Sequence, residues 1–503
     1  MKHVQLTDLD RRRFLFLSSA AALSAGIPSS LAPTLVLGRD IDDGGKPISE
    51  GAWRELASRL SDRLLRPGDP DFTNTALPQN LRYAEVLPAG IARCRDNNDV
   101  AQAILWCREH GVPLATRSGG HSYAGFSTTR GLMINVGPMN TAKFDPTTQT
   151  VRIGGGARNG DLYKALQPTG MTITHGRCPS VGAAGFLLGG GIGFNMRAHG
   201  VGCDQLISTD VVTADGKLQT VAAKDDLFWA CCGGGGGNFG INTSFTLQTF
   251  RTAPVTVFRM RWTADPEAVF AALMRALDAA PTTLGSRISL GAPTPRQRDE
   301  KHDVTVSLLG QFYGRARDLA DILAPVPPAQ STEIFEKSYW DGQEFLSEPG
   351  PPEHYQERST FVTGVLDSRA LATAFDWLRR WPGTSAGADL RFFQTGGKIN
   401  ERAPDDTAYV HRDNRWLMLV GLNWEEHDPP ELLRQNHEWQ DAFYEAMLPY
   451  STRGAYQNFV DPSLTDWQRA YYGKNLDKLR RVKAAVDPDW VFRFAQAIPP
   501  AGQ

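Results

Sequence analysis

Two nucleophilic side chains stand out because each lies among glycines. His121 is in RSGGHSYAG (117–125), and Cys178 is in GRCPSVGAAG (176–185). A neutral imidazole and a thiolate can both attack an electrophilic carbon. Glycine lets the backbone approach a ligand without a Cβ in the way. The alternative for His121 is a core histidine hydrogen-bonded in a turn.

Metal chemistry has little support in the sequence. The six cysteines form no Cys-x-x-Cys pair, and no Cys/His cluster has zinc spacing. Cys178 is the cysteine that we expect to react. The other five are expected to be buried and to behave as small hydrophobes: Cys94, Cys107, Cys203, Cys231 and Cys232.

The bulk composition limits the class of partner. A chain of 503 residues predicts about two to three domain-sized units. Lys+Arg 53 against Asp+Glu 55, with a net charge of -2, gives no overall basic field, so nucleic acid is not expected as a partner. The runs GGGIG and GGGGGNFG indicate backbone close to a ligand, but neither lies between a predicted strand and helix as a dinucleotide-binding fingerprint does.

The first 37 residues are expected to be an export signal and linker. Arg11 and Arg12 precede Phe14, Leu15 and an apolar run to about Ala25, which resembles a twin-arginine signal. The alternative, a membrane anchor, would need roughly 20 apolar residues, so no stable membrane insertion is expected. Twin-arginine export implies a folded, cofactor-loaded cargo and a periplasmic or extracellular destination.

The elements that must position these side chains follow from periodicity and turn residues. Residues 112–118 read as a buried strand, so His121 lies on a tight loop just beyond a strand. Asp215-Gly216 predicts a hairpin. From Pro254 the glycine runs end and long strands alternate with amphipathic helices, which predicts a second domain. The clearest other elements are helices in 51–65, 99–111, 369–381 and 475–488 and strands in 241–250, 303–314 and 415–426.

Five motifs occur in a fixed order along the chain. They cover residues 117–125, 176–206, 233–241, 396–412 and 456–492. Together they resemble the FAD-linked oxidases of the vanillyl-alcohol-oxidase type, with a PCMH-type FAD-binding domain, and among them the berberine-bridge-enzyme-like group. The resemblance extends from about Ala76 to Ile498.

The resemblance implies an α+β fold of three parts. A PCMH-type FAD-binding domain would cover 47–251, and a mixed sheet-and-helix substrate domain would cover 252–453. A C-terminal berberine-bridge-like segment, 454–503, would return to the FAD domain. The oligomeric state is not implied.

The resemblance also implies the cofactor and its attachment. His121 would be bonded to the 8α carbon of the flavin of FAD and Cys178 to its carbon 6. Val181 matches an oxygen-gate position, where valine goes with oxidases and leucine with dehydrogenases. The remaining cofactor-binding positions would be Arg117, Ser118, Gly119, Gly120, Ser122, Gly182, Gly185, Gly193, Ile241 and Asn458.

The implied reaction is oxidation of a CH–OH group by hydride transfer to flavin, with dioxygen reduced to hydrogen peroxide. Tyr456 would be the base, Tyr123 a second candidate, and Gln394 would orient the substrate hydroxyl; ordinary wall packing is the alternative for Tyr123 and Gln394. A carbohydrate hemiacetal or other secondary alcohol ranks first as substrate, and an aromatic or alkaloid-like compound second. Two alternatives stay open: a dehydrogenase that uses a quinone or protein acceptor, and a flavin-carrying or sugar-binding envelope protein without turnover.

Overall fold

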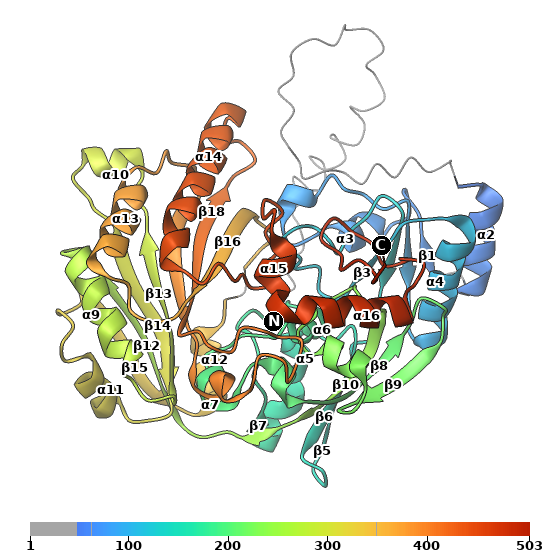
Figure 1. Cartoon of the computed structure of the whole chain (residues 1–503), viewed down its shortest axis with the longest axis horizontal. Helices are drawn as coiled ribbons and strands as arrows, with labels where there is room; N and C mark the ends of the chain where they lie inside the picture. Colours follow the sequence, from blue (N-terminus) through green and yellow to red (C-terminus); the bar gives the residue numbers. More distant parts are fainter. Residues whose placement is uncertain (1–47, 62, 349, 503) are drawn as a thin grey trace, which may run out of the picture. The chain divides into compact units, whose positions relative to one another are not determined.

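The computed structural model describes residues 48–61, 63–348 and 350–502 (Figure 1). The export signal predicted for residues 1–37 lies outside the described residues. Within the described ranges, no helix has both the length and the apolar character needed to cross a bilayer.

The first sheet supports the His121 loop. Three of its strands are parallel, and the fourth, β1, is an antiparallel edge. Helices α2 (Glu50–Arg59) and α4 (Asn97–His110) pack against this sheet, with Trp53 and Trp106 in the shared core. The strand order is β1 (Leu64–Leu65), β2 (Gly90–Arg93), β4 (Leu132–Asn135) and β3 (Leu114–Arg117).

The second sheet is antiparallel and has five strands. The hairpin predicted at Asp215-Gly216 is confirmed, because β8 and β9 pair around it and Gly216 has φ 76°. The strand order is β5 (Ala142–Asp145), β6 (Thr150–Gly154), β10 (Ile241–Gln248), β8 (Leu206–Val212) and β9 (Leu218–Ala222). A separate two-stranded ribbon pairs β7 (Met171–Thr172) with β11 (Phe250–Arg251).

Short helices and the C-terminal segment pack into one core with this second sheet. Helices α15 and α16 contribute Tyr471, Tyr472 and Leu479 to it, and α16 lies beside α8 (Figure 1). The buried Lys483 Nζ donates to the carbonyls of Asn238 and Phe492, at 2.6 and 2.8 Å, which ties the segment down. The helices are α5 (Asn159–Leu166), α6 (Ala183–Leu188), α7 (Met196–His199), α8 (Asp226–Cys231), α15 (Trp467–Tyr472) and α16 (Leu476–Val486), whereas α3 (Phe72–Ala76) packs on β2 of the first sheet.

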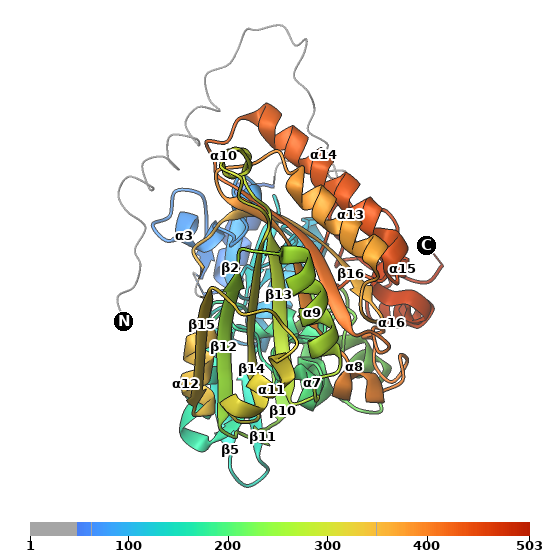
Figure 2. The same ribbon diagram turned by 90° about the vertical axis from the view of Figure 1, so that its left-hand side faces the viewer.

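The third sheet has seven antiparallel strands, all from residues 255–424. One face is covered by a layer of helices, as Figures 1 and 2 show, and the apolar side chains between them form a separate core. The strand order is β15 (Ser331–Lys337), β12 (Val255–Trp262), β14 (Thr305–Phe312), β13 (Leu284–Gly291), β17 (Gly387–Gln394), β18 (Trp416–Trp424) and β16 (His354–Val362). The helices of this region are α9 (Pro266–Asp278), α10 (Pro295–Asp299), α11 (Ala316–Leu323), α12 (Tyr339–Leu346), α13 (Ser368–Arg379) and α14 (Pro430–Met447).

Mixed sheets and helices confirm the predicted α+β class, while the predicted domain boundaries stay predictions. The five cysteines expected to be buried are buried and free, and Cys178 is only partly covered. Cys178 is therefore the one cysteine among the described residues with a partly accessible thiol.

Candidate functional site

The His121 loop is packed backbone to backbone against the loop that follows Cys178. The loop begins where β3 ends, and Gly120 turns it with φ 78°. A Cβ on Gly119 would overlap the backbone nitrogen of Gly182, so only glycine allows this approach. Ser122 Oγ accepts a hydrogen bond from the Phe126 N–H at 3.0 Å and closes the turn.

His121 and Cys178 converge on one hydroxyl. Ser180 Oγ lies 3.0 Å from His121 Nε2 and 3.2 Å from Cys178 Sγ. The Cys178 loop is held by Asn159, whose side-chain amide donates to the Cys178 carbonyl and whose N–H donates to the Val181 carbonyl, both at 3.0 Å. Two nucleophiles that lie far apart in the sequence therefore face one small region.

The His121 imidazole is neutral at neutral pH. Burial and, to a smaller extent, the nearby Arg158 guanidinium together lower the pKa of His121 to about 4. A neutral imidazole keeps a lone pair on one ring nitrogen, which is what a nucleophile or a covalent attachment needs.

An open, glycine-lined region adjoins these loops. Nothing lies within 4 Å of the position that a Cβ on Gly185 would take, and a Cβ on Gly236 would meet only Gly185 and Leu188, at 3.8 Å. Asn458 lies nearby and donates to the Phe186 carbonyl at 2.9 Å. Gly185 and Gly236 are both exposed, so a ligand can approach the backbone here without meeting a side chain.

Other predicted cofactor positions have mainly structural contacts. Arg117 donates to the carbonyls of residues 75–77 and of Ser127, and burial lowers its pKa to about 10, so its guanidinium braces the loop. Its Nη2 atom is buried without a partner. Ser118 Oγ donates to the Gly155 carbonyl at 2.8 Å. Gly193 packs against the His175 carbonyl, and Ile241 is buried in the core beside β4.

The Tyr456 side chain is buried. Its side chain is 1% exposed, and its phenolic oxygen accepts hydrogen bonds from the Gly191 N–H at 2.9 Å and from Asn458 Nδ2 at 3.1 Å. Burial raises the pKa of Tyr456, while these two donors act in the opposite direction. The base role predicted for Tyr456 from the sequence stays a prediction.

Gln394 is also not brought into the site. Strand β17 alternates, so Gln394 points with Leu390 and Phe392 into the helix-covered core. Its Oε1 accepts from Ser286 Oγ at 2.9 Å and its Nε2 donates to the Leu277 carbonyl. Both ends of the amide are thus occupied by partners within the protein, and the predicted role in orienting the substrate stays a prediction.

Tyr123 does reach the other face of the seven-stranded sheet. Its ring lies 5.0 Å from those of Tyr355 and Phe459. Its hydroxyl interacts electrostatically with Glu357 and Arg391, and burial followed by Glu357 raises its pKa. Tyr123 therefore connects the His121 loop with strands β16 and β17.

Sequence reasoning missed a charged cluster on that face of the sheet. Glu348 pairs with two arginines, Arg177 at 2.7 Å and Arg287 at 3.1 Å, and Arg391 pairs with Glu357 at 2.7 Å and Asp389 at 2.9 Å. The available signal was the alternation of charged with apolar residues in GADLRFFQ, whose charged positions share one face.

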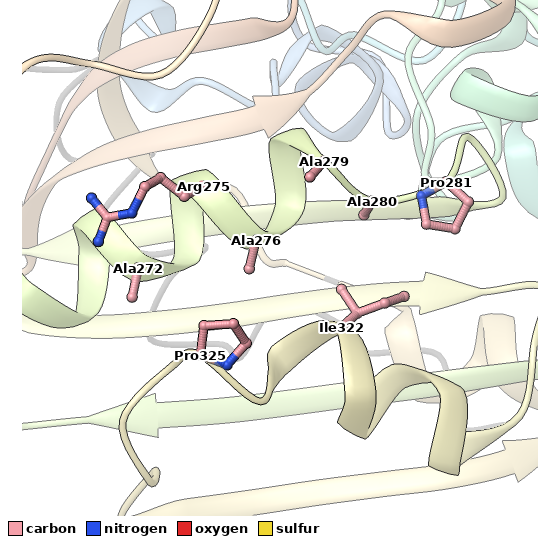
Figure 3. Close-up of a pocket in the computed structure, with 8 residues that line it drawn as sticks. All are labelled: Ala272, Arg275, Ala276, Ala279, Ala280, Pro281, Ile322 and Pro325. Atoms are coloured by element: carbon pink, nitrogen blue, oxygen red, sulfur yellow. The ribbon is translucent and has the colours of Figure 1, made fainter.

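A shallow hollow of about 360 Å³ lies between α9 and α11 (Figure 3). Its lining is largely apolar and includes Ala272, Ala276, Ile322 and Pro325. These helices cover the face of the sheet opposite to Tyr123, so the hollow is separate from the candidate site.

The chain is similar to known flavoproteins over most of its length. Residues 88–222 match the family described as FAD binding domain, and residues 455–499 match that described as berberine and berberine like. The sequence is 33% identical over 456 residues to the uncharacterized FAD-linked oxidoreductase YgaK of Bacillus subtilis, covering 88% of this chain and 98% of that protein. It is 31% identical over 467 residues to the glucooligosaccharide oxidase of Sarocladium strictum, covering 86% and 90%.

The chain is also similar to solved structures over most of its length. The glucooligosaccharide oxidase from Acremonium strictum, described with a 6-S-cysteinyl, 8α-N1-histidyl FAD, has a TM-score of 0.79 and 26% identity, covering 89% of this chain and all of that one. A berberine-bridge-like enzyme of Physcomitrella patens has a TM-score of 0.79 and 25% identity, with the same coverage.

Proposed function

The chain belongs to the FAD-linked oxidoreductases that combine an FAD binding domain with a berberine-like C-terminal segment, and from this premise we propose that it is an oxidase of CH–OH groups. The preferred substrate is a carbohydrate hemiacetal or another secondary alcohol, which becomes a carbonyl. Dioxygen is the final electron acceptor. Relatives that are themselves carbohydrate oxidases support this choice.

The observation that carries the proposal is the convergence of His121 and Cys178 on Ser180. FAD is bonded at its 8α carbon to the neutral His121 imidazole and at its carbon 6 to the Cys178 sulfur. The rest of the cofactor lies beside the backbone of Gly185 and Gly236, where no side chain is in the way. Two covalent bonds hold the flavin without full enclosure, which leaves room for a bulky substrate.

Bound FAD supplies the hydride acceptor and the electrons for dioxygen reduction. The chain's own residues fix the ring, admit oxygen and bind the substrate. Val181 is on the loop that Asn159 holds. At the oxygen-gate position its side chain is smaller than that of leucine. The sheet face that carries Tyr355 and Arg391, against which Tyr123 packs, binds the substrate.

Anaerobic bleaching of the bound flavin tests the proposal. The purified holoprotein is mixed without oxygen with a panel of simple sugars, oligosaccharides such as cellobiose, secondary alcohols and aromatic alcohols. At least one carbohydrate or secondary alcohol should bleach the flavin, and air should restore the colour with formation of hydrogen peroxide. Bleaching that only a quinone or protein acceptor reverses would favour a dehydrogenase, and no bleaching by any compound would favour a protein without turnover.

Export by the twin-arginine route is part of the same proposal. It is supported by Arg11 and Arg12 and by the apolar run that follows them. Replacing both arginines with lysine should keep the flavoprotein in the cytoplasm of an expressing bacterium. Unchanged export of that variant would contradict the proposed route.

A further inference from the structure

An ion pair is built across one strand of the seven-stranded sheet. Glu357 on β16 and Asp389 on β17 both pair in register with Gly421 on the intervening strand β18. A Cβ on Gly421 would overlap Arg391 Nη2 and Asp389 Oδ1. Because Gly421 has no side chain, the Arg391 guanidinium can extend across β18 to Glu357. The distance from Arg391 Nη2 to Glu357 Oε1 is 2.7 Å.

The Glu357 carboxyl keeps one oxygen free. The residue is 6% exposed, and its Oε2 atom is buried without a hydrogen-bond partner. Burial raises the pKa of Glu357, and Arg391 acts against this without cancelling it. A buried, unpartnered carboxylate oxygen is costly, so it is expected at sites that handle protons or ligands. The other charged or titratable groups that face it are Arg287 and Asp389 from the neighbouring strands, Tyr355 from its own strand and Tyr123 from the His121 loop.

Glu357 lies on the face of β16 that is near the flavin-attachment loops. Tyr355 and Glu357 share one face of β16, since side chains two residues apart in a strand point the same way. The Tyr355 ring packs on Tyr123, two residues after His121, and its hydroxyl also interacts electrostatically with Cys178. Both predicted attachment residues are therefore near this face of the strand.

Tyr456, the tyrosine that the sequence suggested as base, is the competing candidate for this role. The Tyr456 hydroxyl is enclosed by the Gly191 N–H and Asn458. Phe459 packs at 5.0 Å from both Tyr456 and Tyr123. Tyr456 also acts electrostatically on Tyr123, so the test below includes a Tyr456 variant.

We propose that Glu357 is the catalytic base, taking the substrate hydroxyl proton on Oε2 while Arg391 positions the carboxylate. This inference rests on the proposed function. The C–H bond breaks with its electron pair, and hydride leaves to the flavin. The O–H bond breaks as the proton passes to Glu357, and the C=O bond forms. Glu357 later returns its proton to solvent.

The test compares Glu357→Gln with wild type in anaerobic stopped-flow reduction by cellobiose, or by the panel member that reduces wild type fastest. Losing a general base should slow reduction by about 10²- to 10⁴-fold. In wild type the rate should fall as the pH drops through the pKa of Glu357, and Glu357→Gln should lack this fall. Asp441→Asn is the matched control, because Asp441 pairs with Arg358 on the opposite face of β16.

A second readout does not depend on turnover. Infrared titration of the holoenzyme, with Glu357→Gln subtracted, should show a carboxyl that protonates above the ordinary glutamate range. A carboxyl that stays ionised below that range would contradict the proposal, because Arg391 would then hold it as a permanent ion.

The two proposals fail in different ways. If no compound bleaches wild type, the proposed function fails. If wild type is bleached and Glu357→Gln, with equal flavin content and melting temperature, is bleached as fast, Glu357 is not the base. Loss of reduction in Tyr456→Phe together with fast reduction in Glu357→Gln would assign the role to the phenol instead.

Discussion

Gly421→Ala should slow flavin reduction although Gly421 itself carries no chemistry. The added Cβ would overlap Arg391 Nη2 and Asp389 Oδ1, so the guanidinium must move away from β18. This breaks the 2.7 Å link between Arg391 and Glu357. A hydrogen bond between charged groups contributes about 1.5–3 kcal/mol, which corresponds to a reduction rate lower by about 10- to 150-fold.

Anaerobic stopped-flow reduction measures this effect, and Gly387→Ala is the matched control. Gly387 lies on the same strand as Arg391 and on the same face, yet nothing lies within 4 Å of its Cβ position. The control should therefore react like wild type. If Gly421→Ala, with an unchanged melting temperature, also reacts like wild type, then Arg391 does not position Glu357 and the reasoning is wrong.

Three further predictions concern stability and oxygen. Lys483→Met should lower the free energy of unfolding in urea by about 3–5 kcal/mol, because the fully buried Asp487 carboxylate loses the cation that pairs with it. The control is Lys474→Met, which removes an exposed ion pair with Asp405 and should lower the free energy of unfolding by less than about 1 kcal/mol. Equal losses in the two variants would contradict this prediction. Burial lowers the pKa of His175 from 6.5 to about 4, so the unfolded chain takes up the proton first. Stability should fall as the pH drops from 6.5 towards 4, by up to about 3 kcal/mol for this residue, and urea unfolding of His175→Gln should show a correspondingly smaller fall. Val181→Leu should lower the ratio of reoxidation by dioxygen to anaerobic reduction severalfold, and an unchanged ratio would remove the oxygen-gate assignment.

Local sequence signals were sufficient for elements with a regular pattern. The alternating segments 303–314 and 415–426 form β14 and β18, and the predicted helix stop at Gly111 is confirmed by its φ of 64°. In these places the pattern of burial, the turn residue and the final structure agree. The convergence of His121 with Cys178 came from the family resemblance, because no local signal links two loops so far apart.

The features of the site that the sequence could not predict depend on long-range structure. Strand alternation predicts that Gln394 and Phe393 face opposite sides, but it does not say which side is the helix-covered core. The charge cluster was missed because the strand order β17-β18-β16 is long-range information, and Arg391 meets Glu357 only through the gap at Gly421. The enclosure of Tyr456 could not be predicted, because it depends on Gly191, which is remote in the sequence.

Intact-protein mass after acid precipitation tests most directly whether one flavin is held by His121 and Cys178. Wild type should keep the mass of one FAD. His121→Ala and Cys178→Ala should each keep it through the remaining bond, with altered absorption spectra, and the double variant should lose it. Complete release of flavin from wild type, or its retention by the double variant, would contradict the account.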